Sequence, residues 1–240
     1  MRELAKFIWA LIIILSLGVT GLTAEERILP IYSVDTEYKQ ISLTFDVAWG
    51  VEDFEEILSI LDDNNVKATF FIVGDWVEKF PEQVKILFEK GHDIANHSDR
   101  HPHVTKLTKE EIKSDIMAAH QKVKDLIGVD MDLYRAPYGE YNSDVVTAAT
   151  ECGYYTIQWD VDSLDWKNYG VEKLIDKVVN HKNLNNGSII LLHTGTDYTK
   201  DALDTIIKKL IEKEYEIVPM SQLLIREEYY CDHLGRQHKK

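Results

Sequence analysis

Short runs of β-branched and aromatic residues alternate with longer stretches of helical period along most of this chain. From residue 41 onward the short runs are apolar, and in the longer stretches the apolar residues return at helical spacing. We count about seven such pairs, and repeated strand–helix units of this kind build parallel sheets. The pattern therefore predicts an α/β fold.

The predicted strands and helices follow one another without a low-complexity linker. Strands are expected at residues 41–48, 67–73, 92–97, 132–137, 156–161, 188–193 and 216–220. Helices are expected at residues 53–64, 82–90, 108–127, 143–151, 171–180, 199–213 and 221–225. Thr108 and Glu111 have the spacing of a capping box, which makes the start of the longest helix the most firmly placed boundary.

The sequence lacks the glycine-rich fingerprint of dinucleotide-binding folds. Seven units without that fingerprint favour a closed or nearly closed parallel barrel over an open doubly wound sheet. A length of 240 residues with 45% hydrophobic residues fits one domain. The same numbers exclude collagen-like, disordered and polytopic membrane proteins.

Charge and cysteine content restrict the partners and the type of site. The chain has 27 Lys+Arg and 41 Asp+Glu, a formal charge of −14 at pH 7, so phosphate backbones would be repelled at long range. We therefore expect no nucleic-acid partner. Cys152 and Cys231 are the only cysteines, which excludes a disulfide framework and a cysteine-based zinc ribbon and leaves open one bridge between them.

The first residues have the composition of an export signal. Arg2 and Lys6 precede an uncharged apolar run at residues 7–19. We expect residues 1–24 to be a cleaved signal peptide or an N-terminal membrane anchor, so that the protein works extracellularly, in the cell wall or on the outer face of the membrane. Residues 25–39 are expected to connect this leader to a domain at residues 40–226, and residues 227–240 to form a polar tail that frays.

Ionisable residues stand at or just after the ends of several predicted strands. In a parallel barrel these ends meet on one face, where active sites form. A single ionisable residue at a strand end is weak evidence of function, but the recurrence favours one shared site. The residues concerned are Asp46, His97, His101, Arg135, Asp160, Asp162 and His193.

His97 and His101 have the spacing of a metal site, and imidazole suits zinc or a similar divalent ion. Position 98 is not Glu and Pro102 follows at once, which disfavours a helical metalloprotease motif. A catalytic zinc ion normally takes three protein ligands and a water. Two histidines therefore predict a metal site with an incomplete ligand set.

Five ordered motifs resemble those of the polysaccharide deacetylases of carbohydrate esterase family 4, the NodB homology domain. They lie at residues 44–46, 97–101, 135–139, 162–166 and 191–193. The resemblance implies a distorted seven-stranded parallel (β/α) barrel, over about residues 40–225, that uses a divalent metal. Such a protein removes N-acetyl groups from amino sugars of peptidoglycan or chitin-like polymers, an amide but not a peptide bond. Residues 45–50 and the leader are most similar to the sporulation-associated bacterial subgroup.

The resemblance also implies an acid and a base. Amide hydrolysis needs an activated water, a stabilised oxyanion and a proton for the departing amine. Asp46 would be the base, oriented by Arg135, and His193 would protonate the amine. Either Asp162 or Asp165 would hold His193, and the sequence leaves this choice open.

The remaining implied roles concern the metal and the substrate. His97 and His101 would hold the metal, and the backbone N–H of Tyr138 would help to stabilise the oxyanion. Leu191, on the same strand face as His193, would line a pocket for the acetyl methyl group. Trp166 would offer a flat surface to the sugar ring, whereas buried positions are expected for Trp49, Trp76 and Trp159.

One position departs from the family pattern. The family's first motif ordinarily has two consecutive aspartates, the second a metal ligand, whereas here Asp46 is followed by Val47. Two alternatives to a metal-dependent sugar deacetylase therefore stay open. The first is a weakly active or inactive glycan-binding barrel, and the second is a metal hydrolase of another amide.

Overall fold

The computed structural model describes residues 28–240. The predicted leader at residues 1–24 lies outside these residues. Within them, no helix is long and apolar enough to cross a membrane.

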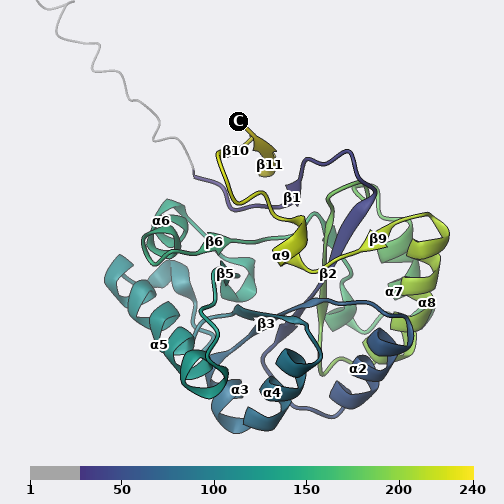
Figure 1. Cartoon of the computed structure of the whole chain (residues 1–240), viewed down its shortest axis with the longest axis horizontal. Coiled ribbons are helices and arrows are strands. Elements are labelled where there is room, and N and C mark those ends of the chain that lie inside the picture. The colour runs from purple at the N-terminus through teal and green to yellow at the C-terminus, as the bar shows by residue number, and fades with distance from the viewer. Residues whose placement is uncertain (1–27) are drawn as a thin grey trace, which may run out of the picture.

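The main sheet is parallel and curls into a half-barrel (Figure 1). Its strand order is β6-β5-β4-β3-β2-β8-β7, and β9 pairs with the start of β2. Every neighbouring pair is parallel, which confirms the predicted distorted barrel of seven parallel strands. The strands are β2 (Gln40–Val47), β3 (Thr69–Ile72), β4 (Asp93–Asn96), β5 (Leu133–Tyr134), β6 (Tyr155–Thr156), β7 (Val161–Asp162), β8 (Ile189–His193) and β9 (Glu216–Ile217).

Helices cover the outside of the sheet. In Figure 1, α2, α7 and α8 lie on one side of β2, α5 and α6 on the other, and α3 and α4 below. The predicted capping box is present: Thr108 accepts the backbone N–H of Glu111, and the helix ends at Gly128 in the left-handed conformation. The helices are α2 (Phe54–Asp63), α3 (Gly74–Lys79), α4 (Pro81–Glu89), α5 (Lys109–Ile127), α6 (Ser143–Glu151), α7 (Val171–Val179), α8 (Thr199–Glu212) and α9 (Met220–Leu223).

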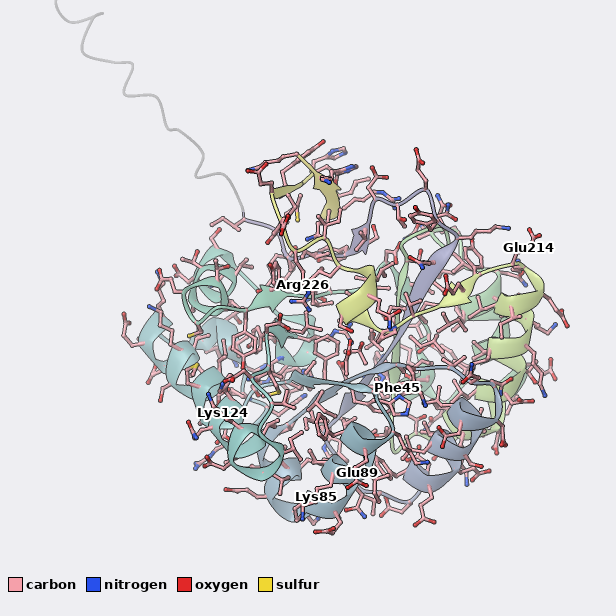
Figure 2. The ribbon with its side chains drawn as sticks, in the orientation of Figure 1. Phe45, Lys85, Glu89, Lys124, Glu214 and Arg226 are labelled. Atoms are coloured by element: carbon pink, nitrogen blue, oxygen red, sulfur yellow. The ribbon has the colours of Figure 1, made fainter. Side chains whose placement is uncertain are left out.

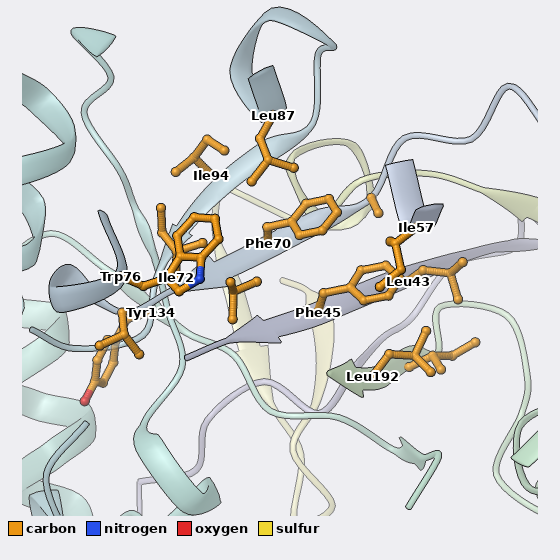
Figure 3. Close-up of a cluster of buried hydrophobic side chains, with 14 of the residues drawn as sticks. Leu43, Phe45, Ile57, Phe70, Ile72, Trp76, Leu87, Ile94, Tyr134 and Leu192 are labelled. Carbon is orange, nitrogen blue, oxygen red and sulfur yellow. The ribbon is translucent and has the colours of Figure 1, made fainter. Parts of the chain in front are cut away.

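The core lies between the sheet and these helices. Apart from its first residue, β2 is buried along its whole length, as expected for a strand with layers on both faces. Phe45 of β2 stacks on Phe70 of β3 with ring centroids 5.0 Å apart, and Trp76, Leu87 and Leu192 belong to the same cluster (Figure 3). Full burial of one such side chain contributes about 1.5–3 kcal/mol to the stability of the fold, so this cluster fixes the strands that carry the site.

The outside of the molecule is charged. Figure 2 shows charged side chains such as Lys85 and Glu89 there.

The structure departs from the prediction in one predicted strand and one helix that was not predicted. The strand expected at residues 156–161 is two short strands, β6 and β7, at opposite edges of the sheet. The residues between them span the open side of the barrel, where Ile157 bridges to Ile31 and the Asp160 N–H bonds to the Ile189 carbonyl. Helix α3 was not predicted, because six residues are too few to show helical periodicity.

The prediction that the C-terminal tail frays is wrong. Strands β10 (Tyr229–Cys231) and β11 (Arg236–Lys239) form an antiparallel pair, and β11 also pairs with β1 (Ser33–Val34). His238 Nδ1 lies 3.0 Å from Asp35 Oδ2, and its Nε2 lies 3.2 Å from Asp232 Oδ2. The polar side chains of this segment therefore pair with one another and with residues beside β1. Figure 1 shows this small sheet at the edge of the barrel, near the C-terminus.

Candidate active site

The carboxyl ends of the parallel strands bring the predicted site residues together. Asp46 is the next-to-last residue of β2 and is paired in register with His193 at the end of β8. His97 follows β4 and Arg135 follows β5, two neighbouring strands that are separated from β2 by β3. A cavity of about 430 Å³ opens here, lined among others by Asp46, His97, His101, Tyr138, Asp162, Trp166, Leu191 and His193.

A larger cavity lies elsewhere. It has a volume of about 680 Å³ and is lined by residues 28–31, part of α6 and the β10 region. Its lining among residues 28–240 brings no buried ion pair or histidine cluster together. We therefore place the chemistry in the smaller cavity, where several ionisable groups converge.

A buried ion pair orients Asp46. The Arg135 Nη1 donates to Asp46 Oδ1 at 2.7 Å, and its Nη2 donates to Thr44 Oγ1 at 2.9 Å and to the Gln158 carbonyl at 3.1 Å. Arg135 is fully buried, and its guanidinium lies 4.0 Å from the centre of the Phe71 ring. This geometry is the one that the resemblance implied for Arg135 and Asp46. Among the described hydrogen bonds, Arg135 donates to Oδ1 and not to the second carboxylate oxygen, Oδ2.

The same pair keeps Asp46 ionised. Burial alone would raise the pKa of Asp46, but the charge of Arg135, together with His97 and His193 in their protonated forms, more than offsets it and holds the pKa below its usual value. Asp46 Oδ2 lies 3.5 Å from His97 Nε2. A carboxylate in this state can accept a proton at neutral pH.

His193 is held by Asp165. The ring Nδ1 lies 2.7 Å from Asp165 Oδ1, and the backbone N–H of His193 donates to Asp165 Oδ2, also at 2.7 Å. Thr199 Oγ1 donates to Asp165 Oδ2 at 2.8 Å. Asp162 instead accepts the backbone N–H of Leu164 at 2.9 Å, a local turn contact. The structure thus distinguishes the two aspartates that the sequence left open.

Asp165 favours the protonated form of His193. Burial alone would lower the pKa of His193, but the hydrogen bond and the charge of Asp165, with a contribution from Asp46, raise it above its ordinary value. An imidazolium at the cavity wall can donate a proton. The cavity therefore holds a base, Asp46, whose surroundings stabilise the carboxylate anion. It also holds an acid, His193, whose surroundings stabilise the imidazolium cation.

Backbone strain concentrates around these residues. Tyr138 has a φ of 60°, and Leu164 and Asn168, on either side of Asp165, have φ values of 54° and 52°. Non-glycine residues in this region cost of order 1–3 kcal/mol each and persist where the surrounding structure enforces them. The strained turns carry Tyr138 and Trp166 to the cavity and place Asp165 behind His193.

His97 and His101 supply two nitrogen donors. His97 Nδ1 lies 2.9 Å from the Arg135 carbonyl, so this nitrogen carries the proton and Nε2 keeps its lone pair. The two rings are in edge contact, with centroids 5.0 Å apart. Burial lowers the pKa of His97, and that of His101 to about 4, so both imidazoles are neutral at pH 7, the form that binds metals.

The donor set does not fit a three-ligand metal site. Val47 is fully buried in the apolar core and offers no donor atom. Among residues 28–240, no group of three or more His, Cys, Asp or Glu side chains could hold a metal ion. Asp46 is the carboxylate closest to His97, and it is already paired with Arg135.

The substrate-facing side of the cavity is apolar and aromatic. Leu191 is 3% exposed and lines its wall, and Trp166 and Tyr138 are more than half exposed at its mouth. The expectation that Trp49 lies in the core is wrong, because it is 61% exposed and lines the cavity. Trp76 is buried as expected, and Trp159 lines the cavity.

Sequence reasoning also missed the ring that supports Tyr138. His103 stacks on Tyr138 with centroids 4.4 Å apart, and its Nδ1 lies 2.9 Å from Glu140 Oε1. Trp49 lies two residues beyond the end of β2, in the loop that follows the strand. This position could have predicted that its side chain is exposed. His103 carries no comparable signal, because its contact partner is distant in the sequence.

Similarity to known proteins identifies the family of this chain. The sequence matches the polysaccharide deacetylase family over residues 33–157. It is 35% identical to a peptidoglycan-N-acetylglucosamine deacetylase of Bacillus cereus, covering 77% of this chain and 68% of that protein. It is 32% identical to an uncharacterised Bacillus subtilis protein, of which it spans 60%.

A solved structure shows the same fold. The wild-type CE4 family pseudoenzyme from Bacillus anthracis superposes with a TM-score of 0.78 at 33% identity, covering 82% of this chain and 69% of that one. A mutant of that pseudoenzyme is described as having restored enzymatic activity. On the sequence match, the shared fold and the arrangement of the five motifs, this chain belongs to the polysaccharide deacetylase family, carbohydrate esterase family 4.

Proposed function

We propose that this protein removes N-acetyl groups from amino sugars of a cell-wall polysaccharide, with peptidoglycan as the leading candidate. The observation that carries the proposal is the pair of dyads, Asp46 with Arg135 and His193 with Asp165, on one cavity. The name of the Bacillus cereus relative supports peptidoglycan as the polymer.

The chain's own residues supply the proton transfers. Asp46 accepts a proton from a water as the water oxygen bonds to the amide carbon, and the backbone N–H of Tyr138 serves as an oxyanion donor. His193 then protonates the sugar nitrogen as the carbon–nitrogen bond breaks, which yields acetate and a free amine. Arg135 and Asp165 keep the base and the acid oriented and ionised. Leu191 contacts the acetyl methyl group.

The proposed metal site has two protein ligands, because Val47 offers no donor atom. His97 and His101 are the side chains that would hold a divalent ion, with zinc the expected metal, and a Lewis acid there would polarise the amide carbonyl. Two imidazoles without a carboxylate predict weak affinity. The steps assigned above use only protein groups and water.

The cellular setting is also a proposal. The basic and apolar leader supports export, with action at the cell wall or on the outer face of the membrane. Residues 45–50 support a role in sporulation through their similarity to that subgroup.

A second candidate is a glycan-binding protein with little or no turnover. Val47 favours it, because the apolar side chain leaves the donor set incomplete. The similarity to a CE4 family pseudoenzyme supports the same alternative.

Acetate release distinguishes the two candidates. The wild-type protein, His193→Ala and the control Asp162→Asn are incubated with an N-acetylglucosamine tetramer and with purified peptidoglycan, each with zinc or cobalt. We expect release by the wild type and the control, and a loss of about 10²-fold or more in His193→Ala. Oligomer binding without acetate release under every condition would replace the deacetylase with the glycan-binding function.

A further inference from the structure

The aspartate that precedes helix α2 bonds to a distant loop and not to its own helix. Asp53 stands at the N-cap of α2, where an aspartate side chain normally accepts a backbone N–H from the first turn. Within the part of the chain that the structure describes, Asp53 makes no such capping bond. Its Oδ2 instead accepts the backbone N–H of Gly195 at 2.8 Å, 142 positions further along the chain. This bond, the Asp53 tether, joins the β2–α2 loop (residues 48–53) to the β8–α8 loop (residues 194–198).

The two joined loops follow the proposed base and the proposed acid. Asp46 is next to last in β2, and His193 is the last residue of β8, the strand beside it. Just past the strand end, the Thr194 N–H donates to the Asp46 carbonyl at 3.3 Å. One residue further on, the Gly195 N–H reaches Asp53. The Asp53 tether therefore continues the attachment of β8 to β2 beyond the ends of the two strands.

The β8–α8 loop also leads to the partner of the acid. Thr199, the first residue of α8, donates its hydroxyl to Asp165 Oδ2 at 2.8 Å, and its Oγ1 lies 2.6 Å from Thr196 Oγ1. Asp165 in turn accepts the ring N–H of His193. A displacement of this loop at Gly195 would therefore reach His193 by two routes. One is the backbone itself, and the other passes through Thr199 and Asp165.

The tether uses one oxygen of a buried carboxylate. Asp53 is 4% exposed, and its Oδ1 has no hydrogen-bond partner among the described residues. Burial is the main reason that the pKa of Asp53 is raised, and the Gly195 N–H acts in the opposite direction. A carboxylate in such a place is costly, and its one accepted N–H is the contact that its position provides. An amide oxygen at position 53 should accept the same N–H.

We propose that Asp53 is a positioning residue for the reaction, which holds the loop after His193 against the loop after Asp46 and so fixes the acid relative to the base. The inference rests on the proposed function for the roles of His193 and Asp46. Asp53 is not among the described residues that line the active-site cavity. Its loss should therefore lower kcat, through misplacement of the acid, and should change KM little.

NMR of the full chain and acetate release from an N-acetylglucosamine tetramer, measured on the same variants, test the tether. Asp53→Ala removes the acceptor, so the Gly195 amide proton should exchange about tenfold faster or more, and the His193 ring signals should shift. Its kcat should fall about tenfold or more, with KM within about threefold of the wild type. Asp53→Asn keeps one acceptor oxygen and should restore the exchange rate, the ring signals and most of kcat.

Val145→Ala is the matched control for a general loss of stability. It truncates a fully buried side chain in α6, a helix that packs against α5 and β6. The variant should have a lower Tm than the wild type. It should leave the His193 ring signals and kcat unchanged when both are measured well below that Tm.

Two results would overturn the positioning role of Asp53. One is an Asp53→Ala protein with wild-type His193 ring signals and wild-type kcat, and the other is an equal loss in Asp53→Asn and Asp53→Ala. Acetate release by the wild type together with either result would leave the deacetylase standing without the tether. No release by the wild type would overturn the deacetylase instead, and NMR changes confined to Asp53→Ala would then still support Asp53 as the residue that positions His193.

Discussion

Replacing Asp165 with Asn tests the link between His193 and its charge partner. Asp165 accepts both the ring and the backbone N–H of His193, each at 2.7 Å, and the Thr199 hydroxyl at 2.8 Å. An amide keeps only one acceptor oxygen and turns a donor toward one of these groups. Because burial lowers the pKa of His193 and Asp165 raises it, the pKa should fall in the variant.

The free-energy change follows from the bonds that are lost. A hydrogen bond to a charged group contributes about 1.5–3 kcal/mol. In the wild type this stability is fully present below the unfolded histidine pKa of about 6.5 and is lost as pH rises through the higher folded value. The difference in unfolding free energy between wild type and Asp165→Asn should therefore be largest in acid and shrink above the folded pKa.

NMR titration of the His193 ring and denaturant unfolding between pH 5 and 9 measure both effects without requiring turnover. Asp162→Asn is the matched control, since its oxygen accepts only the Leu164 N–H among the contacts described, a bond that an amide oxygen also accepts. We expect a lower His193 pKa in Asp165→Asn and no shift in the control. An unchanged His193 pKa in Asp165→Asn, or equal shifts in both variants, would refute the assignment.

Three further predictions follow from buried groups. Val47→Asp should lower the Tm in zinc-free buffer, because a carboxylate replaces a fully buried apolar side chain. Added zinc should raise the Tm of this variant more than that of the wild type. Equal increases in Tm on adding zinc would argue against a missing ligand at position 47. Asp46→Asn should abolish acetate release and cost about 3–5 kcal/mol in unfolding free energy, because the Arg135 charge loses its partner; near wild-type release would remove Asp46 from the mechanism. Burial raises the pKa of Asp160 to about 6, so the contribution of Asp160 to stability falls as pH rises from 3.8 to that value. Asp160→Asn should therefore stabilise the protein at pH 7 by roughly 1–3 kcal/mol, as measured by calorimetry. A less stable variant at pH 7 would contradict this sign.

The sequence predicted the parts of the fold that depend on periodicity and caps. Helix α6 has the predicted bounds, and α5 starts at the capping box of Thr108. The split of residues 156–161 into β6 and β7 could not be predicted, because an apolar run does not show where a sheet opens. The C-terminal hairpin was missed because its polar residues pair with β1, about 200 positions away in the chain.

The residues of the candidate site were likewise predictable only in part. Strand ends located Asp46, His97, Arg135 and His193, since parallel strands bring their carboxyl ends together. The choice of Asp165 over Asp162 depends on a strained turn at Leu164, which no spacing rule predicts. The exposure of Trp49 depends on how its loop is anchored, with Trp76 Nε1 donating to the Gly50 carbonyl and the Gly195 N–H donating to Asp53 Oδ2, so composition alone placed it wrongly in the core.

The pH dependence of acetate release from an N-acetylglucosamine tetramer tests the central claim that Asp46 is the base and His193 the acid. Because the pKa of Asp46 is lowered and that of His193 is raised, the account predicts a bell-shaped profile with a broad plateau around neutral pH. In Asp165→Asn the alkaline limb should move to lower pH, and the acid limb should stay in place. A rate that keeps rising through the alkaline range, or an alkaline limb unmoved in Asp165→Asn, would contradict the account.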